Sequence, residues 1–163
     1  RGEDPADAAF NLLLEEEGAV GMIDFVASEE NIEQALSHPL QMVCTDGLLL
    51  GSKPHPRSYG AFPRVLGTYV REKNVLTWQD AVRRMTSMPA QRLGLKDRGL
   101  LREGYIADVV VFDPETVGSP ATYMEPRQFP TGIPHVMVGG QWVIRDGEYT
   151  GARPGRVLRK GAV

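Results

Sequence analysis

Asp46 is the residue whose type and position most directly suggest chemistry. It follows the short apolar segment Leu40–Cys44, which predicts a strand, and alternation along that strand puts Cys44 and Asp46 on one face. Because catalytic groups lie at the C-terminal ends of the strands in a parallel barrel, Asp46 could point into the mouth of a pocket. The alternative is a plain turn, since aspartate before glycine, here Gly47, is a common turn pair.

His55 and Arg57 form a second candidate group. They lie within residues 47–63, where glycines and prolines predict a long loop, and long loops are uncommon unless they are functional. A histidine and an arginine so close together could bind a carboxylate through charge and hydrogen bonds. The alternative is that both side chains are solvated or structural. Structural roles are also predicted for His38, at a helix end, and for His135, at the start of a strand.

Common catalytic motifs are absent from the sequence. A catalytic zinc site usually needs three protein ligands, yet the histidines are scattered and no His-x-His, His-Glu-x-x-His or Cys-x-x-Cys pattern occurs. The serine-nucleophile elbow, the phosphate-binding loop and the Rossmann glycine pattern are also missing. Cys44, the only cysteine, is predicted to face inward as a small buried residue and not to act as a reactive thiol.

Helices and strands alternate in the first part of the chain, which is the pattern of a barrel or a doubly wound α/β fold. Capping residues, glycines and apolar spacing define the element ends. The predicted elements are a helix from Asp4-Pro5 to Gly18, a buried strand Val20–Val26, a helix from Ser28 to His38-Pro39, and the strand Leu40–Cys44.

The pattern changes near residues 96–106, from helices to antiparallel strands. Before this boundary, the predicted helices are Arg64–Glu72, one capped by Thr77, and a short one that starts at Pro89. After it, the predicted strands are Ala107–Asp113, Val136–Val138 and Trp142–Ile144, the last two joined by a hairpin turn at Gly139-Gly140.

Composition restricts the classes of partner and location. With 163 residues, 42% hydrophobic residues and a net charge of -3, the chain can form one ordinary core and shows no basic excess that would favour nucleic acid. No apolar run is long enough to span a bilayer. A single cysteine is consistent with the reducing cytoplasm, and the start at Arg1 leads us to expect a piece of a longer protein.

Several motifs together resemble one enzyme family. The first is Thr45-Asp46-Gly47 followed by the run from His55-Pro56-Arg57 to Gly67, and Ser28–Glu30 with His38-Pro39 lies upstream. The others are Met85–Ala90, Asp97–Gly99, Gly104 with Ala107–Pro114, Val136–Gly140 and Pro154–Arg156. This set, which covers nearly the whole chain, resembles the D-aminoacylase (N-acyl-D-amino-acid deacylase) branch of the amidohydrolases.

The resemblance implies a fold and a division of the chain. The fold class would be α/β: residues 1–100 as the C-terminal part of a metal-dependent (β/α) barrel with a substrate loop at 47–63, and residues 101–163 as antiparallel strands of a small β-sandwich. The complete enzyme would build that sandwich from both ends of its chain.

The resemblance also implies site residues and a reaction. Asp46 matches the catalytic aspartate and a possible metal ligand, while His55 and Arg57 would lie near the substrate carboxylate. The substrate would be a small N-acyl-D-amino acid, and the complete enzyme would use zinc. The other ligands are expected upstream of Arg1, since Cys44 does not match the family's metal-binding cysteine. This chain alone is therefore expected to hold no zinc and to be inactive.

Two alternatives stay open at this point. The chain could be a non-catalytic accessory domain that packs against a partner barrel, and exposed barrel edges would then favour a homo-oligomer. It could also belong to an amidohydrolase acting on cyclic amides, such as a dihydropyrimidine or dihydroorotate. The Ala-Asp-Val-Val-Val-Phe-Asp run is shared widely among amidohydrolases, whereas the His-Pro-Arg loop favours the D-aminoacylase branch.

Overall fold

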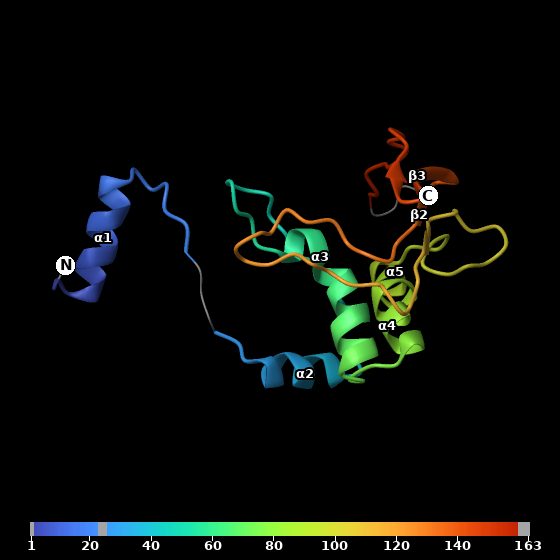
Figure 1. The fold of residues 1–163 in the computed structure, drawn as a ribbon, viewed down its shortest axis with the longest axis horizontal. Coiled ribbons are helices and arrows are strands. Elements are labelled where there is room, and N and C mark those ends of the chain that lie inside the picture. Colours follow the sequence, from blue (N-terminus) through green and yellow to red (C-terminus); the bar gives the residue numbers. More distant parts are fainter. Residues whose placement is uncertain (1, 23–25, 160–163) are drawn as a thin grey trace. The chain divides into compact units, whose positions relative to one another are not determined.

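The computed structural model describes residues 2–22 and 26–159, and the chain divides into two compact units, residues 1–31 and 32–163. The first unit contains α1 (Pro5–Glu15), drawn in dark blue in Figure 1. Asp4 caps this helix by accepting a hydrogen bond from the Ala6 N–H at 2.9 Å, as its N-cap position predicts. The helix ends before Gly18, which adopts a positive φ of 77°.

The strand predicted at Val20–Val26 is not found in the described part of that segment. Residues 20–22 and 26 are exposed and belong to no strand, and residues 23–25 lie outside the described residues. Helix α2 (Glu29–Ser37) follows as predicted. The Ser28 hydroxyl accepts from the Asn31 N–H at 3.3 Å, and the helix ends directly before His38-Pro39.

The prediction that Leu40–Cys44 forms a strand is wrong for this structure. A parallel strand exists only where neighbouring strands pair with it, and within residues 26–159 no strand lies beside this segment. Its Val43 N–H instead donates to the Arg84 carbonyl at 3.3 Å. Cys44 is exposed, contrary to the inward-facing position predicted for it, because the described residues leave its side chain uncovered.

The long loop predicted for residues 47–63 is also wrong in its second half. Helix α3 begins at Arg57 and ends at Arg64, with Pro56 at its N-cap and Pro63 inside it. Proline is well suited to a helix start, so Pro56 is compatible with this assignment. Pro63 provides no N–H for the helical ladder. The chain continues without a break as the wider π-helix η1 (Val65–Glu72), which overlaps the helix predicted at Arg64–Glu72.

Helix α4 (Trp78–Met85) agrees with the helix predicted after Thr77, and α5 (Ser87–Leu93) is the short helix predicted next, although it begins two residues before Pro89. The Thr77 hydroxyl accepts from the Asp80 N–H at 3.2 Å, which is the predicted N-cap. Trp78 packs its ring on Phe112 at a centroid distance of 5.8 Å. None of the helices within the described ranges has the length and apolar character needed to cross a membrane.

The core of the second unit lies among α2, η1, α4 and the turn that follows β1. Apolar side chains from these elements bury one another, which gives the favourable free energy that the ordered backbone requires. The buried members are Leu36, Val65, Leu66, Tyr69, Val70, Leu76, Ala81 and Val117.

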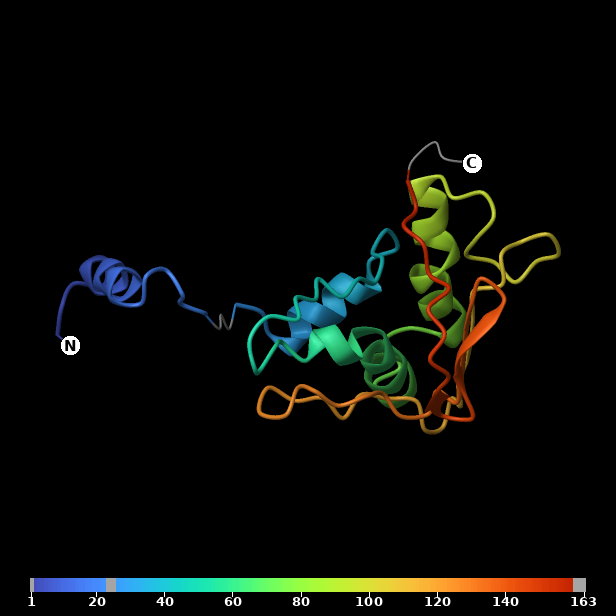
Figure 2. The same ribbon diagram turned by 90° about the horizontal axis from the view of Figure 1, so that it is seen from above.

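A small antiparallel sheet lies beside the α4–α5 pair (Figure 2). Its strand order is β1-β2-β3-β4, and the turn at Gly139-Gly140, with φ of 56° and 81°, joins β2 to β3 as the hairpin signal predicts. Helices with such a sheet agree with the α/β class, while a second sheet of a sandwich and the barrel stay predictions. The strands are β1 (Val109–Val111), β2 (His135–Val138), β3 (Gln141–Arg145) and β4 (Glu148–Tyr149).

Arg84 is a buried polar residue beside this core, with a relative exposure of 4%. Its Nε donates to the Asp80 carboxylate at 2.7 Å, and its Nη1 donates to the carbonyls of Leu36 and His38 at 2.8 and 2.6 Å. These carbonyls lie at the end of α2, where a helix leaves its acceptors unsatisfied. Arg84 therefore ties the end of α2 to α4.

We expect Arg84→Met to lower the free energy of unfolding by about 3 kcal/mol, because it leaves two carbonyls and part of a carboxylate without their donor. Arg83→Met is the matched control: Arg83 bonds to the same Asp80 but is 44% exposed, so its loss should cost less than about 1 kcal/mol. Urea unfolding of both variants measures the difference, and equal losses would contradict the role given to Arg84.

Candidate functional site

The structure brings Asp46 and Arg57 together. The Arg57 Nη2 lies 3.0 Å from the Asp46 Oδ2, and the two side chains are 41% and 79% exposed. Asp46 adopts a positive φ of 44°, which an aspartate in a tight turn tolerates better than most residues. The turn and the functional interpretation of Asp46 are therefore compatible, since the turn presents its carboxylate to Arg57.

Gly47 allows the Asp46 turn to lie against the first turn of α3. A Cβ atom at position 47 would lie 2.9 Å from the Ser58 Oγ and 3.0 Å from the Ser58 Cα, so only glycine fits without a shift. The Gly47 N–H donates to the Thr45 hydroxyl at 3.3 Å, and the Ser58 hydroxyl donates to the Leu48 carbonyl at 3.3 Å. These contacts set the distance between the Asp46 carboxylate and α3.

Arg57 is the first residue of α3, and only part of its guanidinium has an observed partner. One terminal nitrogen pairs with Asp46, whereas the Arg57 Nε is buried and has no hydrogen-bond partner among the described residues. A buried donor without a partner costs free energy unless another group satisfies it. A guanidinium edge with a free donor is suited to binding a carboxylate.

His55 contacts Arg57 through the backbone. Its Nδ1 accepts from the Arg57 N–H at 3.0 Å, and its Nε2 lies 3.1 Å from the Tyr123 hydroxyl. The residue as a whole is exposed, yet both ring nitrogens face protein groups. Partial burial of the ring and the positive Arg57 lower the pKa of His55, while Asp46 opposes the shift.

The segment 118–131 forms one side of this site and was not identified from the sequence. It runs across α3, as the orange trace in Figure 1 shows, and Ser119 occupies the space that a side chain at Gly60 would need. Arg127 donates to the carbonyls of Gly51 and Ser52 at 2.9 and 3.1 Å. No local motif marks this segment in the sequence, because its partners lie about 70 positions away.

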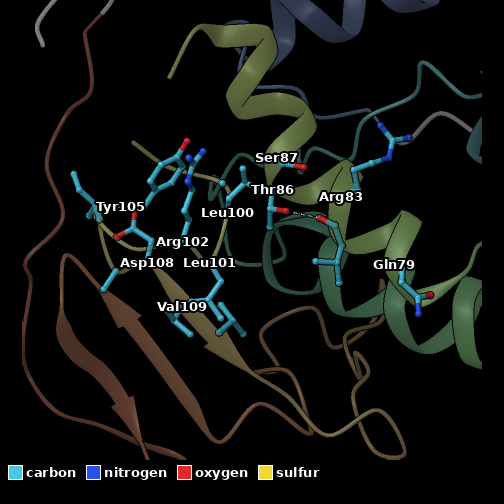
Figure 3. A pocket seen from close by; sticks show the side chains of 15 residues that line it. Gln79, Arg83, Thr86, Ser87, Leu100, Leu101, Arg102, Tyr105, Asp108 and Val109 are labelled. Atoms are coloured by element: carbon cyan, nitrogen blue, oxygen red, sulfur yellow. Dashed lines mark hydrogen bonds between the residues drawn. The ribbon is translucent and has the colours of Figure 1, made fainter. Parts of the chain in front are cut away.

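A hollow lies elsewhere, between the α4–α5 helices and the segment that leads into β1 (Figure 3). It has a volume of about 490 Å³. Figure 3 shows Arg102, Tyr105 and Asp108 on one side of it, with Thr86 and Ser87 on the other. None of its lining residues is a candidate identified from the sequence, so this pocket does not coincide with the Asp46–Arg57 pair.

The amidohydrolase family model matches residues 6–144, which is most of the chain. The chain belongs to the amidohydrolase family. Within that family, the resemblance to D-aminoacylases is confirmed by two curated relatives from Alcaligenes xylosoxydans xylosoxydans. An N-acyl-D-aspartate deacylase is 43% identical over 98% of this chain and 33% of its own length. A D-aminoacylase is 42% identical over 87% of this chain and 29% of its own length.

A solved amidohydrolase structure resembles the fold. It is the N-acyl-D-glutamate deacylase from Bordetella bronchiseptica, crystallised with zinc and a phosphonate inhibitor that mimics the tetrahedral intermediate. The TM-score is 0.76 at 46% identity, over 81% of this chain and 28% of the other. The chain thus spans about a third of the length of the relatives it matches.

The described residues do not by themselves fit a zinc ion of the kind that amidohydrolases bind. A zinc site needs about four ligands, most of them histidine, cysteine or carboxylate. Across residues 2–22 and 26–159, no group of three or more such side chains is placed to hold a metal. Asp46 could supply one ligand, and its observed partner is the Arg57 guanidinium.

We expect the pKa of His55 to lie below its ordinary value of about 6.5 and to respond to both charges of the site. Arg57→Gln should raise the pKa of His55, because a neighbouring positive charge disfavours the imidazolium, and Asp46→Asn should lower it further. NMR titration of the His55 ring measures both shifts. Arg64→Gln, on the same helix, is the control, and shifts of the opposite sign would contradict this electrostatic description.

Proposed function

We propose that residues 1–163 are the C-terminal third of a metal-dependent N-acyl-D-amino-acid deacylase, which hydrolyses the linear amide bond of its substrate. The Asp46–Arg57 pair, 3.0 Å apart, carries this proposal, because it places a proton acceptor beside a carboxylate-binding group. The relatives named as deacylases of N-acyl-D-aspartate and N-acyl-D-glutamate support the same substrate class.

Asp46 is proposed as the general base and then the general acid. Its carboxylate accepts a proton from the water that attacks the acyl carbonyl, and it delivers that proton to the nitrogen of the departing amino acid. The C–N bond breaks, and the products are a carboxylic acid and a free D-amino acid. The exposure of Asp46, 79%, leaves its oxygens accessible to both water and substrate.

Arg57 is proposed to bind the α-carboxylate of the substrate. The Arg57 side chain is 41% exposed, so part of its guanidinium remains accessible to a substrate carboxylate. Because Arg57 also pairs with Asp46, the bound carboxylate would lie close to the catalytic group and fix the amide next to it. His55, two residues away, was predicted to lie near the same carboxylate.

Zinc in the complete enzyme would polarise the water and the acyl carbonyl, with Asp46 as a possible ligand and the others from parts of the protein outside this chain. The same parts would provide the neighbouring strands that Leu40–Cys44 needs to become a barrel strand. The chain alone should then show no stoichiometric zinc and no hydrolysis of N-acetyl-D-amino acids. Turnover by the chain alone would refute this division. A cytoplasmic location stays a prediction from the single cysteine.

A non-catalytic packing role is the second candidate, because large apolar side chains are exposed next to the site. Leu48, Leu49 and Leu50 are 66%, 64% and 73% exposed, and Phe129 is 82% exposed. Such a surface would pack against another part of the protein or against a second copy of this chain. Normal activity of a complete enzyme carrying Asp46→Asn would favour this packing role over catalysis.

Asp46→Asn in the complete enzyme should lower kcat about 10²- to 10⁴-fold, because the amide cannot accept the proton, while KM changes little. Asp146→Asn is a closely matched control. Asp146 is also followed by glycine, also has a positive φ and is also 79% exposed. Steady-state kinetics with an N-acyl-D-amino acid compare the two variants, and similar effects would argue against a catalytic Asp46.

Arg57→Ala in the complete enzyme should raise KM about 10- to 100-fold for an N-acyl-D-amino acid, since a hydrogen-bonded charge is lost. The matched control is the substrate itself with its carboxylate converted to a carboxamide. Its hydrolysis by wild type and by Arg57→Ala should differ little. An equal loss for both substrates would make Arg57 a structural residue only.

A further inference from the structure

His55 closes the first turn of α3, which is the turn that carries Arg57. Its ring Nδ1 accepts from the Arg57 N–H at 3.0 Å, and its carbonyl accepts from the Ser58 N–H at 3.1 Å. The first N–H groups of a helix have no partner within the helix. Pro56, at the N-cap, makes no side-chain hydrogen bond to them, so the imidazole takes the place of the usual capping side chain.

The contact to Arg57 also decides where the proton of the neutral imidazole lies. Because Nδ1 accepts a hydrogen bond, it carries no proton, and the neutral ring must be protonated at Nε2. The Nε2–H then donates to the Tyr123 hydroxyl at 3.1 Å. Tyr123 also packs edge-on against the ring, with centroids 5.0 Å apart, so it holds both the tautomer and the orientation.

We infer that His55 is a positioning residue, held as the Nε2–H tautomer by Tyr123, and that it orients Arg57 for the substrate carboxylate instead of binding that carboxylate itself. The inference rests on the proposed function of Arg57 and deepens it. Both ring nitrogens are already engaged within the protein, which leaves no ring donor for a substrate. Tyr123, from the segment 118–131, thereby becomes part of the site.

Protonation of His55 would act against this arrangement. An imidazolium carries a proton on Nδ1 and would present it to the Arg57 N–H, so that two donors face each other. The groups that face the ring are the Arg57 N–H and guanidinium, the Asp46 carboxylate and the Tyr123 hydroxyl. His55 is therefore useful here as a neutral acceptor.

The other two histidines provide internal references. The Nδ1 of His38 accepts from the Leu40 N–H at 3.3 Å, and that of His135 accepts from the Asp146 N–H at 3.1 Å. All three should show the Nε2–H tautomer when neutral. The contact with the Tyr123 hydroxyl distinguishes His55 from the other two. Tyr123→Phe removes that hydroxyl and keeps the ring, so it should change the tautomer equilibrium of His55 and leave those of His38 and His135 unchanged.

The first experiment uses this chain and needs no activity. Two-bond ¹H–¹⁵N NMR at a pH where the histidines are neutral should show protonated Nε2 and unprotonated Nδ1 for His55. Amide hydrogen exchange of Arg57 should stay slow in His55→Asn, whose side-chain oxygen takes the place of Nδ1, and become about tenfold faster in His55→Gln. A protonated Nδ1, or equally slow exchange in both variants, would overturn the inference.

The second experiment measures kinetics of the same variants in the complete enzyme. His55→Gln should raise KM for an N-acyl-D-amino acid about tenfold with little change in kcat, whereas His55→Asn stays near wild type. If His55 bound the substrate directly through Nε2, His55→Gln would be the milder change and the inference would fail. A complete wild-type enzyme without deacylase activity would refute the proposed function, while the exchange experiment would still decide the positioning role.

Discussion

The second unit depends on the hydrogen bonds that the buried Arg84 guanidinium donates. It reaches the end of α2 through the carbonyls of Leu36 and His38, while the Arg84 carbonyl accepts from the Val43 N–H. A buried charge is costly unless it is paired, and here Asp80 provides the pair. Burial alone would raise the pKa of Asp80, but hydrogen bonds from Arg83 and Arg84 outweigh it and lower that pKa. Contacts of the Arg84 side chain and of its backbone carbonyl therefore hold the chain between the end of α2 and Val43.

A second constraint is the close contact between the helices and the segment that crosses them. Val117 is fully buried, and a Cβ at Gly67 would lie 2.7 Å from the Val117 carbonyl oxygen. Arg71 donates to the same carbonyl at 2.6 Å. The segment 118–131 therefore starts from a fixed point on η1 and crosses α3, which brings Tyr123 to His55 and Arg127 to the loop at Gly51 and Ser52.

The described site offers some of the groups that amide hydrolysis uses and lacks others. It offers a carboxylate, a guanidinium with a free buried donor and a neutral imidazole, which together are suited to proton transfer and carboxylate binding. It does not offer a set of metal ligands within the described residues. The relatives are about three times as long as this chain, so the proposed enzyme would complete the metal site and the barrel with residues outside residues 1–163.

The sequence by itself determined the features whose causes are local. Asp4 and Thr77 identify helix starts because their side chains bond to N–H groups two or three residues away, and Gly139-Gly140 identifies a hairpin because the turn needs positive φ. The set of motifs along the chain was enough to recognise the family, which the family model over residues 6–144 and the relatives at 43% and 42% identity confirm. Local patterns could not show that α3 begins at Arg57 within a proline-rich segment.

Only the tertiary structure decided the features that depend on distant partners. Leu40–Cys44 has the composition of a strand, yet it is not one here, because pairing requires a neighbour and not only suitable side chains. The contact of Asp46 with Arg57, and of His55 with Tyr123, joins residues 11 and 68 positions apart. The spacing of residues along a sequence carries no information about such distances until packing brings the segments together.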